Sequence, residues 1–232
     1  MKSKGKRLLI LGATAGEISL VKRAQEFGIY VIVTDNHKDY SLAPAKYIAD
    51  EAWDISWSDI DLLEKKCVDN HIDGVLAGYS EFRVENMIKL CERLNLPCYI
   101  NSEQLDITRD KIKFKECCRR YGVPVVREYK SIEEVDKFPV IVKPTDRAGS
   151  IGISIANNLK ELEKAYQYAY EMSVEKRVII EEYIYKADKV DFYYLAENGQ
   201  LTLLTSCDTI NAKNNGFSKV VQSAWLYPEK NL

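Results

Sequence analysis

Apolar and polar residues follow two alternating patterns along the first hundred positions. Continuous apolar runs lie at Leu8–Leu11, Tyr30–Thr34, Val75–Ala77 and Cys98–Ile100. Such runs are typical of strands that a parallel sheet buries on both faces. Between them, apolar residues recur at helical spacing over 18–28, 62–68 (behind a Ser58 cap) and 84–94. This β-α-β-α order predicts right-handed crossovers and a Rossmann-like, doubly wound parallel sheet.

The pattern changes after Asn101, where we place a domain boundary. Helices are expected over 102–107, 110–121 and from Leu159 to about Met172. Strands are expected over 125–129, 138–143, 178–181, 189–196 and 200–206. Asn198-Gly199 separates the last two and suits a tight hairpin turn. The second unit is therefore predicted to be α+β.

Composition narrows the function classes. The chain has 232 residues, 46% apolar and 29% charged, with a net charge of -2. It carries no overall basic field for nucleic acid or an anionic membrane, and no run of transmembrane length. Six cysteines without a CxxC pair, together with only two histidines, form no zinc motif and fit a reducing cytoplasm.

A glycine loop, Gly12–Gly16, joins the first predicted strand to the first helix, and Asp35 ends the second strand. A nicotinamide-binding site has a loop and an acid at these places. However, the spacing is G-x-x-x-G, and Thr14 and Ala15 carry Cβ atoms where bare backbone is needed. Two other interpretations are open. The loop can be a tight strand-to-helix turn, or its amides and Asp35 can face a carboxylate or amine substrate. An NAD(P)-binding oxidoreductase stays an alternative.

One lysine of the second unit, Lys143, suits phosphate binding. Lys111 lies at the start of a predicted helix, and Lys143 closes a buried strand, from which its ammonium group can reach phosphate oxygens. The loop over 145–153 contains two glycines and a serine, and it could offer backbone N–H groups to phosphates.

Four motifs follow one another in this order: Asp110-Lys111, Pro139–Pro144, Gly149-Ser150-Ile151-Gly152 and Glu181-Glu182-Tyr183-Ile184. In this order and spacing the sequence resembles the ATP-grasp superfamily, and most of all its carbamoyl-phosphate-synthase-like ligases. Residues 1–101 resemble the pre-ATP-grasp domain, and 102–180 the small subdomain with its glycine-rich lid. Residues 181–232 resemble the start of the large subdomain, so the ATP-grasp domain is expected to be truncated at its C-terminus.

The resemblance implies an ATP site in which the two lysines hold the α- and β-phosphates and the lid closes over the β- and γ-phosphates. The backbone of the hinge strand would meet the adenine. The implied binding residues are Lys111, Lys143, Gly149, Ser150, Gly152, Glu181, Glu182, Tyr183, Ile184 and Asp188. Asp188 falls where relatives place a glutamate that contacts the ribose hydroxyls. The alternative is that Asp188 is a solvated loop residue. Because strand residues alternate, only one of Glu181 and Glu182 can face the pocket.

Two basic residues are candidates for catalysis. Arg147 could reach the γ-phosphate or an acidic substrate, or be a solvated loop residue. Lys219 resembles a basic residue that lines the acceptor side in biotin-carboxylase-like members.

The implied reaction phosphorylates a carboxylate or bicarbonate with ATP, and an amine, ammonia or another nucleophile attacks the acyl phosphate. Mg²⁺ would bridge the phosphates. Relatives place their metal-binding acids later in the large subdomain, so we assign no metal ligand here and expect a chain that binds nucleotide without turnover. An uncovered sheet edge would favour a homodimer. A non-catalytic nucleotide-binding fragment is the other alternative.

Overall fold

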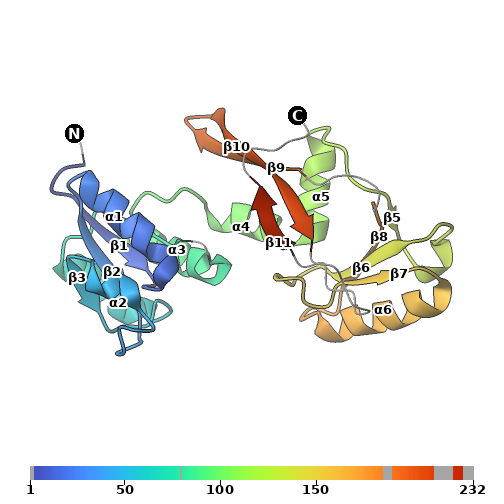
Figure 1. Ribbon diagram of the computed structural model, residues 1–232, viewed down its shortest axis with the longest axis horizontal. Coiled ribbons are helices and arrows are strands. Elements are labelled where there is room, and N and C mark those ends of the chain that lie inside the picture. The colour runs from blue at the N-terminus through green and yellow to red at the C-terminus, as the bar shows by residue number, and fades with distance from the viewer. Residues whose placement is uncertain (1–2, 79, 185–189, 212–221, 227–232) are drawn as a thin grey trace. The chain divides into compact units, whose positions relative to one another are not determined.

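The computed structural model describes residues 3–78, 80–184, 190–211 and 222–226 (Figure 1). The chain forms two compact units, residues 1–105 and 106–232. Each unit has its own sheets and its own buried core.

The first unit is built on a parallel sheet. Its strands are β1 (Arg7–Leu11), β2 (Tyr30–Thr34), β3 (Glu51–Trp53) and β4 (Gly74–Leu76). They lie side by side in the order β3-β2-β1-β4, and Leu9 is opposite both Ile32 and Val75. The parallel sheet expected from the continuous apolar runs is confirmed.

Helices cover both faces of this sheet. Ile10 and Val33 pack with Val21 of α1 (Ile18–Glu26) on one face. On the other face, Leu9 and Ile32 pack with α2 (Ile60–Asp69) and α3 (Glu81–Leu94). Short 3-10 turns, η1 (Ala15–Glu17) and η2 (Pro44–Tyr47), complete the unit. Successive strand residues point to opposite faces, so burial on both sides explains why these strands are apolar without interruption.

Two local expectations were wrong in the first unit, and one strand was not predicted. Residues 98–100 form no strand: Tyr99 and Ile100 lie in a bend, and Cys98 and Tyr99 are exposed where a strand of a covered sheet would be buried. The edge strand β3 gave no pattern, since only Trp53 of its three residues is buried. The cap of α2 is Asp59 and not Ser58, since its carboxylate accepts the Leu62 amide at 3.2 Å.

The second unit contains an antiparallel sheet covered by one long helix. α4 (Ser102–Arg109) leads into it and α5 (Lys111–Arg120) follows. The strands are β5 (Glu128–Tyr129), β6 (Val140–Pro144), β7 (Ser154–Ala156) and β8 (Val178–Glu182), in the order β5-β8-β6-β7. A short turn, η3 (Ile132–Glu134), precedes β6. The strand expected over 125–129 is shorter than predicted.

α6 (Leu159–Met172) lies along the sheet beside β6 and β7 (Figure 1). Leu162 and Ala165 of this helix pack against Val140, Val142 and Ile180. Strand alternation therefore places Ile141, Lys143, Ile179 and Glu181 on the opposite face of the sheet.

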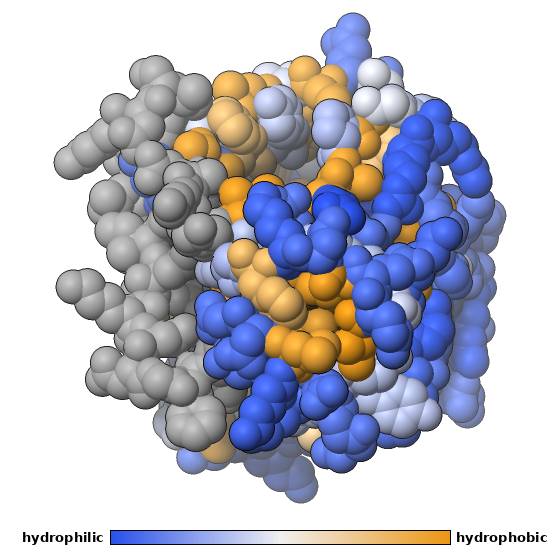
Figure 2. All heavy atoms as spheres, turned by 90° about the vertical axis from the view of Figure 1, so that its right-hand side faces the viewer, coloured by the Kyte–Doolittle hydropathy of each residue, from blue (hydrophilic) through white to orange (hydrophobic). Residues whose placement is uncertain are grey.

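A separate three-stranded antiparallel sheet follows in the chain. It consists of β9 (Val190–Glu197), β10 (Gln200–Asn211) and β11 (Gln222–Leu226), in the order β11-β10-β9. Asn198 and Gly199 both have positive φ, 51° and 76°, between β9 and β10, which confirms the expected tight hairpin. Exposed apolar side chains occur on both strands, such as Tyr194 and Leu201. Figure 2, which views the molecule from the right-hand side of Figure 1, shows hydrophobic residues bordered by hydrophilic ones on that face.

Two buried cysteines belong to the core of the first unit, and a third, Cys207, is buried on β10. Cys67 and Cys91 pack beneath the sheet, and burial raises the pKa of each thiol to about 12. In the part of the chain that the structure describes, no helix is both long enough and apolar enough to span a membrane.

Candidate functional site

Asp110 fixes the start of α5. Its Oδ1 accepts the amides of Ile112 at 2.8 Å and Lys113 at 3.1 Å, and its Oδ2 accepts Arg177 Nη2 at 2.5 Å. Burial opposes ionisation of this carboxyl, but the amide of Lys113 and the guanidinium of Arg177 outweigh it and lower its pKa. The acid of the Asp110-Lys111 motif therefore has a structural role: it ties the first turn of α5 to the segment that enters β8.

Lys111 connects α5 to the base of the glycine loop. Its backbone N donates to Thr145 O at 3.2 Å, and its Nζ lies 2.7 Å from Arg147 O and 3.5 Å from Thr145 O. Burial lowers the pKa of Lys111, and the positive charge of Lys143 lowers it further. The ammonium group is thus partly dehydrated and close to a second positive charge, an effect that Asp146, Glu181 and Asp110 offset in part.

Lys143 and Glu181 form an ion pair on the sheet face opposite α6. Lys143 is opposite Ile179 in the β6–β8 ladder, so it lies diagonally across from Glu181. Its Nζ is 2.5 Å from Glu181 Oε2, and Glu181 is only 2% exposed. Burial raises the pKa of Glu181, but Lys143 and Lys115 outweigh that effect and hold it below its ordinary value.

Three charged residues extend this cluster and were not anticipated from the sequence. Lys115 Nζ contacts Glu181 Oε1 and lies 3.2 Å from Glu128 Oε1, and Arg119 contacts the other oxygen of Glu128. Lys111, Lys115 and Arg119 recur every four residues along α5, which places them on one helix face. That spacing is the sequence signal that could have revealed Lys115 and Arg119.

The glycine loop is anchored at its base to the end of α6. Asp146 accepts the Ser173 hydroxyl at 2.9 Å and the Glu175 amide at 2.7 Å. A Cβ added to Gly152 (φ 75°) would lie 2.8 Å from both Met172 Cβ and Pro144 Cγ, so only glycine fits there. Gly149 (φ 65°) has nothing within 4 Å of such a Cβ. The loop is held at Gly152 and open at Gly149.

Arg147 points to the end of α6. Its Nε donates to Met172 O at 2.6 Å, while its carbonyl accepts Lys111 Nζ. Its contact with a phosphate or an acidic substrate stays a prediction. Lys219, the other catalytic candidate, lies outside the described residues, as does Asp188.

The Glu181–Ile184 segment separates its two glutamates. Glu181 shares a face with Lys143, whereas the Glu182 carboxylate lies on the other side, 3.1 Å from Lys137 Nζ. The Glu182 and Tyr183 amides donate to Arg127 O at 3.0 Å and Pro139 O at 3.3 Å. Ile184 follows the strand and is 60% exposed. Glu181 is therefore the glutamate that faces the lysines.

The glycine loop of the first unit is a closed turn. Thr14 and Glu17 form a capping box, and Glu17 Oε1 accepts Arg83 Nη1 at 2.8 Å. A Cβ on Gly12 would lie 2.3 Å from Arg83 Cζ, so this guanidinium occupies the space above the first glycine. Asp35 Oδ1 is bound by His37, through N at 2.9 Å and Nδ1 at 2.6 Å. A dinucleotide would need the space above Gly12 and the Asp35 carboxylate. In this structure Arg83 lies in that space and His37 binds that carboxylate.

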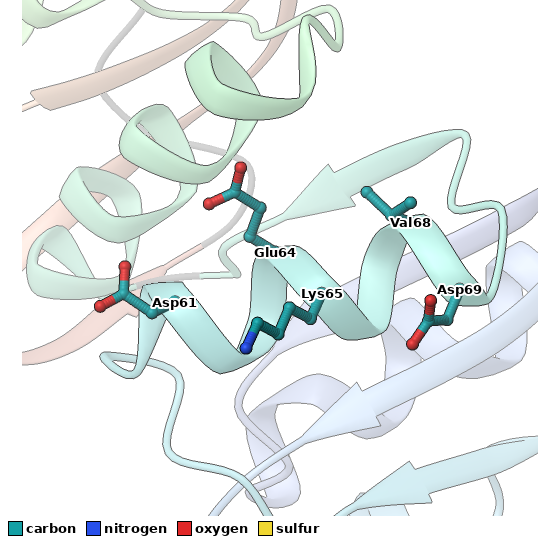
Figure 3. Close-up of a pocket in the computed structure, with 5 residues that line it drawn as sticks. All are labelled: Asp61, Glu64, Lys65, Val68 and Asp69. Atoms are coloured by element: carbon teal, nitrogen blue, oxygen red, sulfur yellow. The ribbon is translucent and has the colours of Figure 1, made fainter.

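A surface concavity in the first unit has no matching chemistry. It is lined by Asp61, Glu64, Lys65, Val68 and Asp69, which all project from α2 (Figure 3). Arg93 Nη1 already pairs with Asp61 at 2.5 Å and with Glu64 at 3.1 Å. The lysine cluster of the second unit is therefore the stronger candidate site.

Comparison with protein families matches residues 111–219 to the D-ala D-ala ligase C-terminus. A 2-oxoglutarate carboxylase small subunit from Hydrogenobacter thermophilus is 27% identical, with the alignment covering 95% of this chain and 52% of that protein. A formate-dependent phosphoribosylglycinamide formyltransferase from Prochlorococcus marinus is 26% identical over 77% of this chain and 48% of its own length.

Solved structures share the fold. The biotin carboxylase domain of the Hydrogenobacter thermophilus 2-oxoglutarate carboxylase, a dimer in complex with MgADP, ADP and bicarbonate, superposes with a TM-score of 0.75 at 24% identity, covering 88% of this chain and 50% of that one. A phosphoribosylglycinamide synthetase from Anaerococcus prevotii gives 0.68 at 26% identity, over 91% and 54%. The chain spans about half the length of the relatives it matches.

Proposed function

We propose that this chain, whose resemblance to ATP-grasp ligases the comparisons confirm, binds ATP at the lysine cluster of its second unit. The observation that carries the proposal is that Lys111 is bonded to the base of the glycine loop and lies close enough to Lys143 for that positive charge to lower its pKa. These are two of the expected phosphate-binding residues, and they come from a helix and a strand separated in sequence. The comparisons give no support to an oxidoreductase.

The electrostatics of the cluster favour a polyanion. Lys111 Nζ donates to the carbonyl groups of Thr145 and Arg147, and Lys143 shares Glu181 with Lys115. Phosphate oxygens would supply charge-assisted hydrogen bonds to both ammonium groups. Bare backbone at Gly149 leaves room for the loop to approach the phosphates. The adenine would then lie along the backbone of Glu182–Ile184.

In the proposed reaction, ATP activates a carboxylate or bicarbonate as an acyl phosphate for attack by an amine or another nucleophile. The protein's part is to position the γ-phosphoryl group and neutralise its charge. Within the described ranges, no group of three His, Cys, Asp or Glu side chains is placed to hold a metal ion, and Glu181 is engaged by two lysines. Mg²⁺ is commonly bound by one or two carboxylates together with substrate phosphates and water, and we assign it no ligand and no step here.

The complete reaction belongs to the proposal, because the relatives are about twice as long as this chain. Homodimer formation and a cytoplasmic location are likewise proposals. The absence of turnover by these 232 residues alone stays a prediction, and magnesium-dependent ADP release would test it.

Titration calorimetry with the purified chain tests the nucleotide site. We expect ATP and ADP to bind, with no heat from NADH at the same concentrations, because the space above Gly12 is filled by Arg83. Binding by NADH that equals or exceeds that of ADP would overturn the proposal and restore the nicotinamide alternative.

The affinity should depend on pH through Lys111. Its pKa is lowered in the free protein, and a bound polyphosphate favours the charged ammonium group, so binding raises that pKa and takes up protons. The affinity is then complete below the lowered pKa of the free lysine and falls as pH rises through it. Calorimetry in buffers of different ionisation enthalpy measures the uptake, and Lys111→Arg, which stays charged, should abolish it. Equal proton uptake in Lys111→Arg would contradict this role.

A further inference from the structure

We propose that Lys115 is a positioning residue of the nucleotide site, which acts by neutralising Glu181 so that Lys143 is available to phosphate. The inference rests on the proposed function. It concerns a residue outside the four motifs and outside the implied set of ligands.

Two glutamates on neighbouring strands explain why a cation is required at the position of Lys115. In the β5–β8 ladder, Glu128 and Glu181 are directly opposite each other, and like charges in that arrangement destabilise a sheet. Lys115 Nζ lies between them, in contact with Glu181 Oε1 and 3.2 Å from Glu128 Oε1. Its side chain is only 11% exposed, so the charge is poorly screened by water.

The same carboxylate connects Lys115 to Lys143. Glu181 presents one oxygen to each lysine, Oε1 to Lys115 and Oε2 to Lys143 at 2.5 Å. A buried carboxylate with a single cationic partner holds that partner tightly, because an uncompensated charge in this place is costly. With Lys115 present, Glu181 already has one compensating cation, and Lys143 can share its charge with a ligand.

Glu128 has a second cationic partner besides Lys115. Arg119 contacts Glu128 Oε2, so the negative charge of Glu128 still has a cationic partner when Lys115 is removed. Loss of Lys115 therefore leaves Glu181 as the carboxylate that must be satisfied by Lys143 alone. The charge balance predicts that Lys143 is then drawn toward Glu181 and away from the phosphates.

The test is a mutant cycle read by calorimetric ADP affinity. Lys115→Met should weaken ADP binding about tenfold, within the range of coupling measured in ionic networks. In a Glu181→Gln background, where no charge holds Lys143, the same Lys115→Met change should leave the affinity unchanged within about twofold. A purely structural lysine would change the free energy of unfolding but would not show this dependence on Glu181.

A second variant separates an effect on folding stability from an effect on ADP affinity. Lys115→Met with Glu128→Gln removes the opposing carboxylate, so the sheet should regain its stability while ADP affinity stays low. Parent-like affinity in Lys115→Met, equal losses with and without the Glu181 charge, or full recovery of affinity in the double variant would overturn the inference. Failure of the unaltered chain to bind ADP would overturn the proposed function itself, and the two failures are thus distinguishable.

Discussion

Replacing both Lys111 and Lys143 by methionine is expected to weaken ATP binding by about 100-fold or more, since each charged hydrogen bond contributes about 1.5–3 kcal/mol. The chain should still fold. Lys111 donates to carbonyl groups at the loop base, and Glu181 keeps Lys115 as a partner after Lys143 is lost. Calorimetry measures the affinity, and circular dichroism checks the fold.

A matched control separates this effect from the loss of two positive charges in general. Lys160 and Lys164 are exposed on α6, so their double replacement by methionine changes the net charge equally without touching the cluster. This control should bind ATP like the parent. If the Lys111/Lys143 variant also binds like the parent, the two lysines are ordinary surface residues and the site lies elsewhere.

Gly152→Ala is expected to destabilise the second unit by about 2–4 kcal/mol, from overpacking together with the strain of a left-handed backbone. The new methyl carbon would lie 2.8 Å from Met172 Cβ and from Pro144 Cγ, so α6 or β6 must move. Hydrogen exchange of the α6 and β6 amides should accelerate. Denaturant unfolding followed by circular dichroism gives the free energy.

Gly149→Ala is the internal control for this prediction. Gly149 also has positive φ, at 65°, but no atom lies within 4 Å of an added Cβ. Only the backbone strain, about 1–2 kcal/mol, should appear there. Equal stability of the two alanine variants would mean that the loop base does not pack against α6 as described.

The sequence pattern predicted the parallel sheet because buried strands need continuous apolar residues, and β1 and β2 have them. It did not predict β3, whose Glu-Ala-Trp sequence carries no alternation that distinguishes a short edge strand from a loop. Residues 98–100 are apolar enough for a strand, but Cys98 and Tyr99 are exposed, and whether an apolar run is buried in a sheet depends on tertiary packing that a local pattern does not contain.

For the candidate site, the motifs led to Lys111, Lys143 and Glu181, which the structure brings together. They did not reveal that Glu128 is opposite Glu181, because strand register depends on pairing between distant segments. Asp146 lies within the predicted 145–153 loop, and its carboxylate fastens that loop to the segment after α6. Such tertiary contacts are invisible in a local pattern.

The most direct test of the nucleotide site is the pattern of backbone amide shifts in nuclear magnetic resonance spectra on addition of ATP to the unaltered chain. The account predicts the largest shifts at Lys111, in the loop from Gly149 to Gly152 and at the end of β8 around Ile184. The Gly12–Gly16 turn should be little affected. Largest shifts at Gly12–Gly16 and Asp35, with the lysine cluster unchanged, would contradict the assignment of ATP to the second unit.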